Sequence, residues 1–383
     1  MSIRFRTREI GSLAKPSWRV KAFAGQPLEE ADLEEARRWG SRLAVADHER
    51  LVGLLASGRV DETRLAEVDD WAARYALALL ERTGLDVVYD GEQRRTEMYD
   101  HVASNAGGFE ERGLVRSFDN KYYAKAALVA QPALDKPYDV DEYRFAASHT
   151  TRDVKVPLTG AYTIVDWSYD EYYGSPGELG GSRESRTGAR RRFVQDVAER
   201  VIRPNAQALA DAGCSWLQID EPAAATRPDE ADLVVLGFNV ALGGIDAERK
   251  SMHICFSDYS SLWPAVLELD ACLELQLEFA NRDSRELGTT DEARPGYAHT
   301  LELFRQEGSP GVGLGVLDIH SDFIEPAELV RDRILYAVEA LGDPGRIQVN
   351  PDCGLRTRSW KVVYEKLSRM VEGTRLAEQT LNQ

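Results

Sequence analysis

Short apolar runs alternate with longer amphipathic stretches along the chain. The short runs are rich in aliphatic and β-branched residues, as expected of buried strands. Eight of them predict strands, at residues 3–12, 87–92, 154–160, 215–221, 251–256, 273–278, 312–318 and 347–353. The longer stretches have apolar positions three and four residues apart, which predicts helices with one buried face. The clearest of these are residues 28–56, 61–83, 187–212, 325–341 and 359–373.

Strands that alternate with helices favour parallel βαβ units. Eight such strands predict an α/β protein, a single (β/α)8 TIM barrel, formed by residues 1–383 as one domain. A doubly wound open sheet is the alternative, but no glycine-rich phosphate turn follows the first predicted strand.

Two long insertions interrupt this pattern. Residues 95–152 separate the second and third predicted strands, contain Asp119, Asn120 and Lys121, and are long enough for strands or a hairpin of their own. Residues 168–191 follow the third strand and are rich in Gly, Ser, Tyr and Arg. Both could reach the catalytic face as lids. The second could equally be a flexible surface loop.

Composition narrows the range of partners and compartments. A formal net charge of −17 disfavours nucleic acid and anionic membrane surfaces as partners. We expect no membrane span, because no apolar run approaches the roughly 18 residues that a spanning helix needs. The charged N-terminus has no apolar signal core. Four unevenly spaced cysteines predict no disulfide framework, and a reduced cytoplasm suits them.

Polar residues recur where the predicted strands end. In a (β/α)8 barrel the catalytic groups lie at the C-terminal ends of the strands. Each such residue alone could be an ordinary turn or helix-cap residue, but seven of the eight strand ends carry them. They are Ser12, Asp90 and Glu92, Asp220 and Glu221, His253 and Cys255, Glu278, Asp318 and His320, and Cys353.

Four of these residues are typical metal ligands. His253 and Cys255 are two positions apart, so they share one face of an extended strand. The plain alternative for this pair is a buried strand cysteine near a histidine. Cys353, in a turn after the last strand, and Glu278 complete a nitrogen, oxygen and sulfur set that fits tetrahedral Zn²⁺ if the strands lie side by side. We expect Cys214 and Cys272 to be ordinary buried thiols.

Seven motifs, in their order along the chain, resemble the catalytic, C-terminal barrel of cobalamin-independent methionine synthase. They are Ile10-Gly11-Ser12, Asp90-Gly91-Glu92, Leu158-Thr159-Gly160 with Trp167-Ser168, Gln218-Ile219-Asp220-Glu221-Pro222-Ala223, His253-Ile254-Cys255, Asp318-Ile319-His320-Ser321 and Asn350-Pro351-Asp352-Cys353-Gly354-Leu355. The resemblance implies a (β/α)8 fold and zinc-dependent methyl transfer to the thiol of homocysteine, which forms methionine.

The resemblance also implies roles for individual residues. His253, Cys255, Glu278 and Cys353 would bind zinc, although the residues beside Glu278 differ from the usual family context. Ser12 would hold the carboxylate of homocysteine, and Glu92 and Asp220 its ammonium group. His320 would handle the proton, steadied by Asp318, and Trp167 would stack on a folate ring.

The methyl donor stays open. The full-length synthase has a second, N-terminal barrel that helps to bind polyglutamylated folate, whereas this sequence predicts one barrel. The donor is therefore a methylfolate or a methylcorrinoid such as methylcobalamin, which a corrinoid protein could deliver. A zinc site with three anionic ligands suits thiol alkylation better than hydrolysis. The alternatives are an alkyltransferase acting on another thiol such as coenzyme M, a zinc hydrolase, and a non-catalytic zinc-binding barrel.

Overall fold

Seven parallel strands form a curled sheet at the centre of the protein. The computed structural model describes residues 2–116, 122–174 and 183–383. The sheet order is β1-β4-β6-β7-β8-β9-β10, so each strand pairs with the next one along the chain that belongs to this sheet. Its strands are β1 (Val87–Val88), β4 (Asp153–Thr159), β6 (Trp216–Asp220), β7 (Arg249–Ile254), β8 (Glu274–Leu277), β9 (Gly311–Gly315) and β10 (Ile347–Asn350).

The N-terminal stretch closes this sheet into a barrel. Thr7 forms a parallel bridge to Val349 in β10, and Arg8 forms one to Val87 in β1. The backbone N–H of Arg8 donates to the carbonyl of Val349 at 3.1 Å. The stretch therefore occupies the place of the predicted first strand, but isolated bridges replace a regular ladder. One physical reason lies at Ile10, whose carbonyl accepts hydrogen bonds from side chains inside the barrel instead of from a neighbouring strand.

Alternation along the strands separates an apolar layer from a polar interior. In β6, Leu217 and Ile219 are buried in the hydrophobic core, whereas Gln218 makes polar contacts inside the barrel. Arg8 and Glu274 form a buried ion pair there, with 2.6 Å between Nη2 and Oε1. The polar interior follows from the period of two in the strands and continues upward into the strand ends that carry the candidate site.

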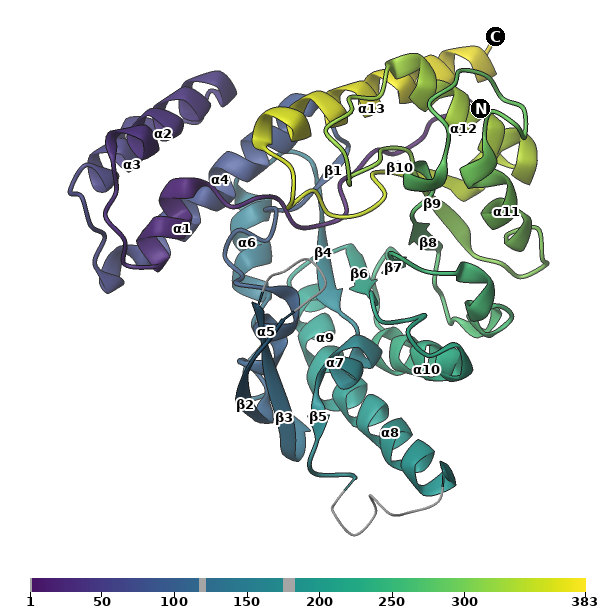
Figure 1. The fold of residues 1–383 in the computed structure, drawn as a ribbon, viewed down its shortest axis with the longest axis horizontal. Coiled ribbons are helices and arrows are strands. Elements are labelled where there is room, and N and C mark those ends of the chain that lie inside the picture. Colours follow the sequence, from purple (N-terminus) through teal and green to yellow (C-terminus); the bar gives the residue numbers. More distant parts are fainter. Residues whose placement is uncertain (1, 117–121, 175–182) are drawn as a thin grey trace.

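Helices cover the outside of the sheet. Figure 1 shows α10, α11, α12 and α13 outside the curled strands and the pair α2 and α3 to one side of the molecule. The α-helices are α1 (Ser17–Phe23), α2 (Glu30–Leu43), α3 (His48–Leu55), α4 (Leu65–Thr83), α5 (Met98–Ala103), α6 (Val140–Ser148), α7 (Ala161–Trp167), α8 (Arg183–Val197), α9 (Arg203–Asp211), α10 (Ala231–Leu242), α11 (Pro295–Leu303), α12 (Ala327–Leu341) and α13 (Trp360–Leu381). A π-helical turn, η2 (Ala198–Ile202), joins α8 to α9.

The single helix predicted over residues 28–56 is wrong in one respect. The structure divides it into α2 and α3, because Ala44 and Asp47 adopt left-handed backbone conformations with φ of 53° and 57°. A left-handed residue cannot continue a right-handed helix. Neither position is a glycine, so no residue in the sequence marked the break, and the apolar spacing predicted one continuous helix. None of the helices in the described ranges combines the length and apolar character needed to cross a lipid bilayer.

A second, three-stranded sheet lies outside the barrel. β2 (Gly107–Arg116) and β3 (Tyr122–Ala133) pair antiparallel, and β3 pairs in parallel with the short β5 (Tyr169–Asp170). This sheet packs against α5 and α8 and extends away from the barrel in Figure 1. Asp119, Asn120, Lys121 and residues 175–182 of the second insertion lie outside the described residues. The lid role of both insertions stays a prediction.

Candidate active site

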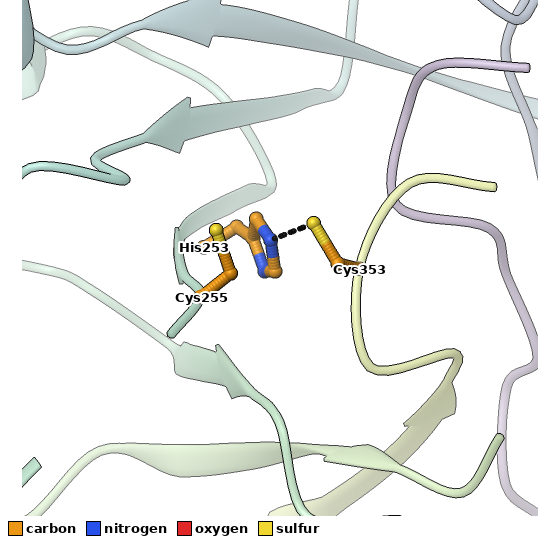
Figure 2. A group of neighbouring side chains, drawn as sticks. All are labelled: His253, Cys255 and Cys353. Atoms are coloured by element: carbon orange, nitrogen blue, oxygen red, sulfur yellow. Dashed lines mark hydrogen bonds between the residues drawn. The ribbon is translucent and has the colours of Figure 1, made fainter. Parts of the chain in front are cut away.

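Three metal-ligand side chains meet at the C-terminal ends of the strands. One ligand atom each from His253, Cys255 and Cys353 lies within 4.8 Å of the others. His253 is in β7 and Cys255 follows it, whereas Cys353 comes from the turn after β10, so the barrel brings together residues 100 positions apart. Figure 2 shows the imidazole of His253 directed toward the sulfur of Cys353.

The imidazole of His253 is fixed through both nitrogens. Its Nδ1 lies 3.0 Å from the carbonyl oxygen of Gln276 in β8, and its Nε2 lies 3.4 Å from the sulfur of Cys353. A carbonyl can only accept, so Nδ1 carries the proton and Nε2 faces the two sulfurs. Metal-binding histidines are commonly oriented by such a second contact. The donor set therefore fits a zinc ion held by Nε2 and two thiolates.

The protonation of this group reflects its burial and its own charges. Burial disfavours the imidazolium of His253, but its contact with Cys353 and the charges of Asp220 and Glu278 outweigh burial and raise the pKa of the imidazole. The contact with Cys255, together with burial, raises the pKa of the Cys353 thiol well above its usual value. A divalent cation would reverse both preferences, because it favours thiolates and a neutral imidazole.

Glu278 lies close to this group but is not one of its three members. It follows β8, is fully buried, and its Oε2 accepts a hydrogen bond of 2.7 Å from the side chain of Asn281. Its other oxygen, Oε1, has no hydrogen-bond partner among the described residues, and Nε2 of His320 is 3.8 Å away. A buried carboxylate oxygen without a hydrogen-bond partner is suited to bind a cation. The role of Glu278 as the fourth zinc ligand stays a prediction.

His320 faces the same carboxylate. The contact with Glu278 raises the pKa of the imidazole, although burial opposes it. The ring of Phe256, the residue after Cys255, meets the His320 ring edge to face at 4.6 Å between centroids. Asp318 instead fixes the backbone of this turn, because its carboxylate accepts from the His320 N–H at 2.8 Å and from the hydroxyl of Ser321 at 2.9 Å.

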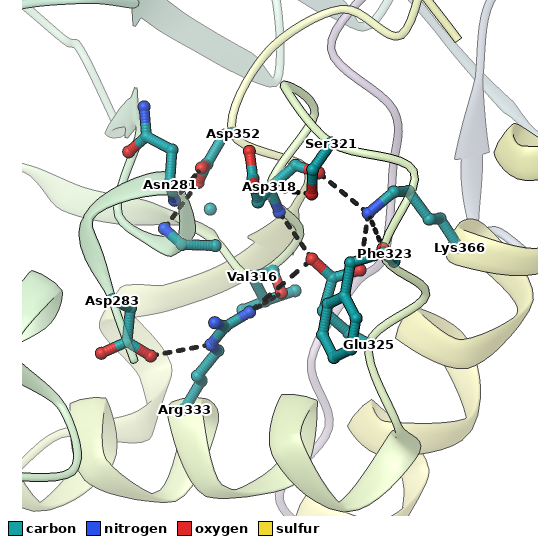
Figure 3. A network of polar contacts seen from close by, with 12 residues as sticks. Asn281, Asp283, Val316, Asp318, Ser321, Phe323, Glu325, Arg333, Asp352 and Lys366 are labelled. Carbon is teal, nitrogen blue, oxygen red and sulfur yellow. Dashed lines mark hydrogen bonds and ion pairs between the residues drawn. The ribbon is translucent and has the colours of Figure 1, made fainter. Parts of the chain in front are cut away.

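A network of polar contacts supports the turns that carry Glu278 and His320 (Figure 3). The carboxylate of Asp352 accepts the backbone N–H groups of Phe279, Ala280 and Asn281, which fixes the turn that follows Glu278. Burial raises the pKa of Asp352 to about 7. On the other side, Lys366 donates to the carbonyl of Asp318 at 2.8 Å. These groups hold the two turns in place from behind the site.

The three predicted acceptor-binding residues lie near one another. A Cβ added to Gly354 would come within 2.6 Å of the Ser12 hydroxyl, and one added to Gly11 within 2.6 Å of Glu92 Oε1. Both glycines therefore allow close packing between Ser12, Glu92 and the turn that holds Cys353. Burial raises the pKa of Asp220 to about 6, and the charges of His253 and Glu92 act on it with opposite sign.

Trp167 lies at the end of α7, where its ring is 6.3 Å from the ring of Tyr99 in α5. Among the described residues it shares no hydrogen bond, ion pair or ring contact with the cysteine and histidine group.

The predicted buried thiols are confirmed, since Cys214 and Cys272 are buried and each Sγ donates to a backbone carbonyl at 3.3 Å.

A second group of metal-ligand types, His101, Asp139 and Glu142, does not suit a cation. The guanidinium of Arg95 pairs with Asp139 at 2.8 Å and with Glu142 at 3.0 Å. That positive charge already neutralises the carboxylates, so this group is a buried ion-pair network. The spacing of these residues in the sequence did not predict this ion-pair network.

The profile of the family described as "Cobalamin-independent synthase, Catalytic domain" matches residues 45–376. The chain belongs to this family of cobalamin-independent methionine synthases. The resemblance seen in the sequence is thereby confirmed.

Several curated family members match nearly the whole chain. The methionine synthase of Thermoplasma acidophilum is 38% identical over 385 aligned positions, which cover 95% of this chain and 96% of that protein. The methionine synthase of Thermococcus kodakarensis is 32% identical over 333 positions, covering 87% and 90%. These family members are therefore close to this chain in length.

A solved family structure shows the same fold. A B12-independent methionine synthase from Shewanella sp. W3-18-1, in complex with selenomethionine, superposes with a TM-score of 0.73 at 21% identity and covers 99% of each chain. A putative vitamin-B12 independent methionine synthase from Listeria monocytogenes gives a TM-score of 0.65 at 16% identity. The (β/α)8 prediction is confirmed.

Proposed function

We propose that this protein is a zinc-dependent S-methyltransferase that methylates the thiol of homocysteine to form methionine. The observation that carries the proposal is the group formed by His253, Cys255 and Cys353 at the strand ends of a barrel of this family. Glu278 would be the fourth ligand. Zinc bound there would hold the substrate sulfur as a reactive thiolate at neutral pH. Thiolate ligands persist in the reducing cytoplasm, where we expect the enzyme to act.

The acceptor would be oriented by groups around the zinc ligands. Glu92 and Asp220 offer two carboxylates to its ammonium group, and the Ser12 hydroxyl offers a donor to its carboxylate. This arrangement favours an α-amino acid over coenzyme M, which has no ammonium group for the two carboxylates to bind. It also disfavours a purely structural zinc site, which has no use for nearby carboxylates.

His320 would handle the proton that balances the reaction. The sulfur–carbon bond forms as the bond between the methyl group and its donor breaks. A demethylated folate then takes up a proton, and an imidazole within reach can supply it. Nε2 of His320 lies 3.8 Å from Oε1 of Glu278, so the imidazole is next to the proposed zinc ligands. Asp318 acts on this step indirectly, through the turn that positions His320.

The donor would be a methylfolate or a methylcorrinoid, the latter free or carried by a partner protein. A parallel assay tests the whole proposal. Homocysteine is offered with methyltetrahydrofolate, its polyglutamate or methylcobalamin, and methionine is measured for protein with and without bound zinc. Methionine from at least one donor, only with zinc, is the expected result. Zinc-dependent hydrolysis without methyl transfer, or zinc binding with no reaction of any donor, would overturn it.

A further inference from the structure

Gln218 lies inside the barrel, directly below the candidate acceptor site. It is in the middle of β6, two residues before Asp220, so both side chains point to the same face of the strand. Its side chain is fully buried. A buried amide at this position must find partners for its oxygen and for its NH2 group, and the partners it finds are informative.

All of its contacts lead to the acceptor site. Its Nε2 donates to Oδ1 of Asp220 at 2.6 Å and to the carbonyl of Ile10 at 2.8 Å. Its Oε1 accepts from the ammonium of Lys155 at 2.9 Å. This orientation of the amide is the only one that works, because an ammonium can only donate whereas a carboxylate and a carbonyl can only accept.

The two groups that Gln218 joins belong to elements that β1 and β4 separate in the barrel. Asp220 ends β6, and Ile10 immediately precedes Gly11 and Ser12 on the stretch that closes the barrel. Lys155 reinforces the link, since it also donates to the Ile10 carbonyl and lies 3.4 Å from Glu9. Gln218, supported by Lys155, therefore links the carboxylate of Asp220 to the stretch that carries the hydroxyl of Ser12.

We propose that Gln218 is a positioning residue that holds the carboxylate of Asp220, relative to the stretch that carries Ser12, in place for the ammonium group of an α-amino acid. The bond to Oδ1 leaves Oδ2 of Asp220 available to the ammonium group of the substrate, while Ser12 serves its carboxylate. Gln218 thus determines the specificity for amino-acid thiols. The inference rests on the proposed homocysteine-binding role of Asp220 and Ser12, and it adds Gln218 as the residue that positions Asp220.

Two variants separate the donor role of Gln218 from its volume. Gln218→Glu keeps the shape and the acceptor for Lys155 but loses both donated hydrogen bonds and adds a charge beside Asp220. Gln218→Met keeps a similar volume without any polar contact. Gln276→Met is the matched control, because it removes a fully buried side-chain amide that donates to Ser251 and Glu274 rather than to the acceptor site. The substitution keeps the backbone carbonyl of Gln276 that contacts His253.

Calorimetry on the zinc-loaded protein provides the test. The probes are L-homocysteine and 4-mercaptobutanoate, which has the same chain and carboxylate but no amino group. We expect both Gln218 variants to bind homocysteine about ten- to a hundredfold more weakly. This is the effect of losing the charged hydrogen bond between a displaced Asp220 and the ammonium group of the substrate. Their affinity for 4-mercaptobutanoate should change no more than Gln276→Met changes it.

Four results would overturn the inference. They are unchanged homocysteine binding in the Gln218 variants, an equal loss for both thiols, the same selective loss in Gln276→Met, and wild-type protein that does not bind homocysteine. Binding of homocysteine without methyl transfer from any donor would instead reject the proposed function, and the calorimetric comparison would still decide the role of Gln218.

Discussion

At the scale of single residues, the candidate zinc site depends on sulfur atoms that no neighbouring group can replace. Cys255 and Cys353 approach the same imidazole from different strands. We expect purified protein to contain about one zinc per chain. Cys353→Ser and Cys255→Ser should each lose most of it in metal analysis, because a serine hydroxyl is not ionised at neutral pH. Cys272→Ser is the control and should keep its zinc. Full zinc in both ligand variants would refute the assignment.

Glu92 gives a second test at this scale. It lies against Gly11 beside Ser12, where its carboxylate can meet the ammonium group of an acceptor. Removing its charge in Glu92→Gln should weaken the use of homocysteine by about ten- to a hundredfold, since a hydrogen bond to a charged group contributes roughly 1.5–3 kcal/mol. Steady-state kinetics should show little loss for 4-mercaptobutanoate. An equal loss for both thiols would remove Glu92 from this role.

The sequence revealed the residue types of this site but not all of its contacts. His253, Cys255 and Cys353 could be found because strand ends of a barrel converge and cysteine is rare in this chain. The contacts of the Gln276 carbonyl and of the Phe256 ring could not be predicted. A backbone group leaves no signal in the sequence, and an aromatic residue is usually part of the hydrophobic core. Asp318 was expected to steady His320, and it does so through the backbone rather than the ring.

At the scale of elements, helix α7 shows how one side chain outside a helix can hold its start. The carboxylate of Glu221 accepts the N–H groups of Tyr162 and Thr163 at 3.1 and 2.7 Å. We expect Glu221→Ala to lower the free energy of unfolding by about 1–3 kcal/mol, because it leaves buried N–H groups without an acceptor. Chemical denaturation measures this loss.

Gly160→Ala should also destabilise the protein, since the added Cβ would meet the carboxylate of Glu221.

A double-mutant cycle checks the reason. Once Glu221 is alanine, the new Cβ at position 160 has space, so Gly160→Ala should cost much less in that background. Additive losses would mean that the two residues act independently.

The pH dependence of stability follows from the same residue. Burial raises the pKa of Glu221 from 4.5 to about 7. The folded protein therefore keeps this proton at a pH where the unfolded chain has released it, and the contribution of Glu221 to stability falls as the pH rises from about 4.5 to 7. Denaturation curves of wild type and Glu221→Ala across this range should converge toward higher pH. A difference that grows with pH would show that the hydrogen bonds outweigh burial.

The strands could be predicted more closely than the helices. Seven of the eight predicted runs contain or overlap a strand of the barrel sheet, because buried parallel strands are short continuous apolar runs. The break between α2 and α3 could not be foreseen, because non-glycine residues adopt its left-handed conformations. The first run differs for another reason. Its partners at Ile10 are side chains of Lys155 and Gln218, which lie far along the sequence.

At the scale of the whole molecule, the charges of the described residues near the second insertion bear on the choice of methyl donor. The sequence has three consecutive arginines here, Arg190 to Arg192, in a chain with a net charge of −17. Arg190 is paired with Asp166 and Glu230 at 2.6 Å each, and Arg191 with Asp232 at 3.1 Å. Two of these three arginines are therefore already paired with carboxylates.

This charge distribution leads to a prediction about the methyl donor. We expect the chain alone to use free methyltetrahydrofolate and its polyglutamate poorly, and a methylcorrinoid to be the better donor. The pairing of Arg190 and Arg191 with carboxylates leaves less positive charge for a long anionic tail, and the net charge of −17 also disfavours it. Steady-state rates of methionine formation with homocysteine and each donor decide the question. Turnover with a methylfolate on the order of 1 s⁻¹ or more, together with none from methylcobalamin, would contradict the prediction.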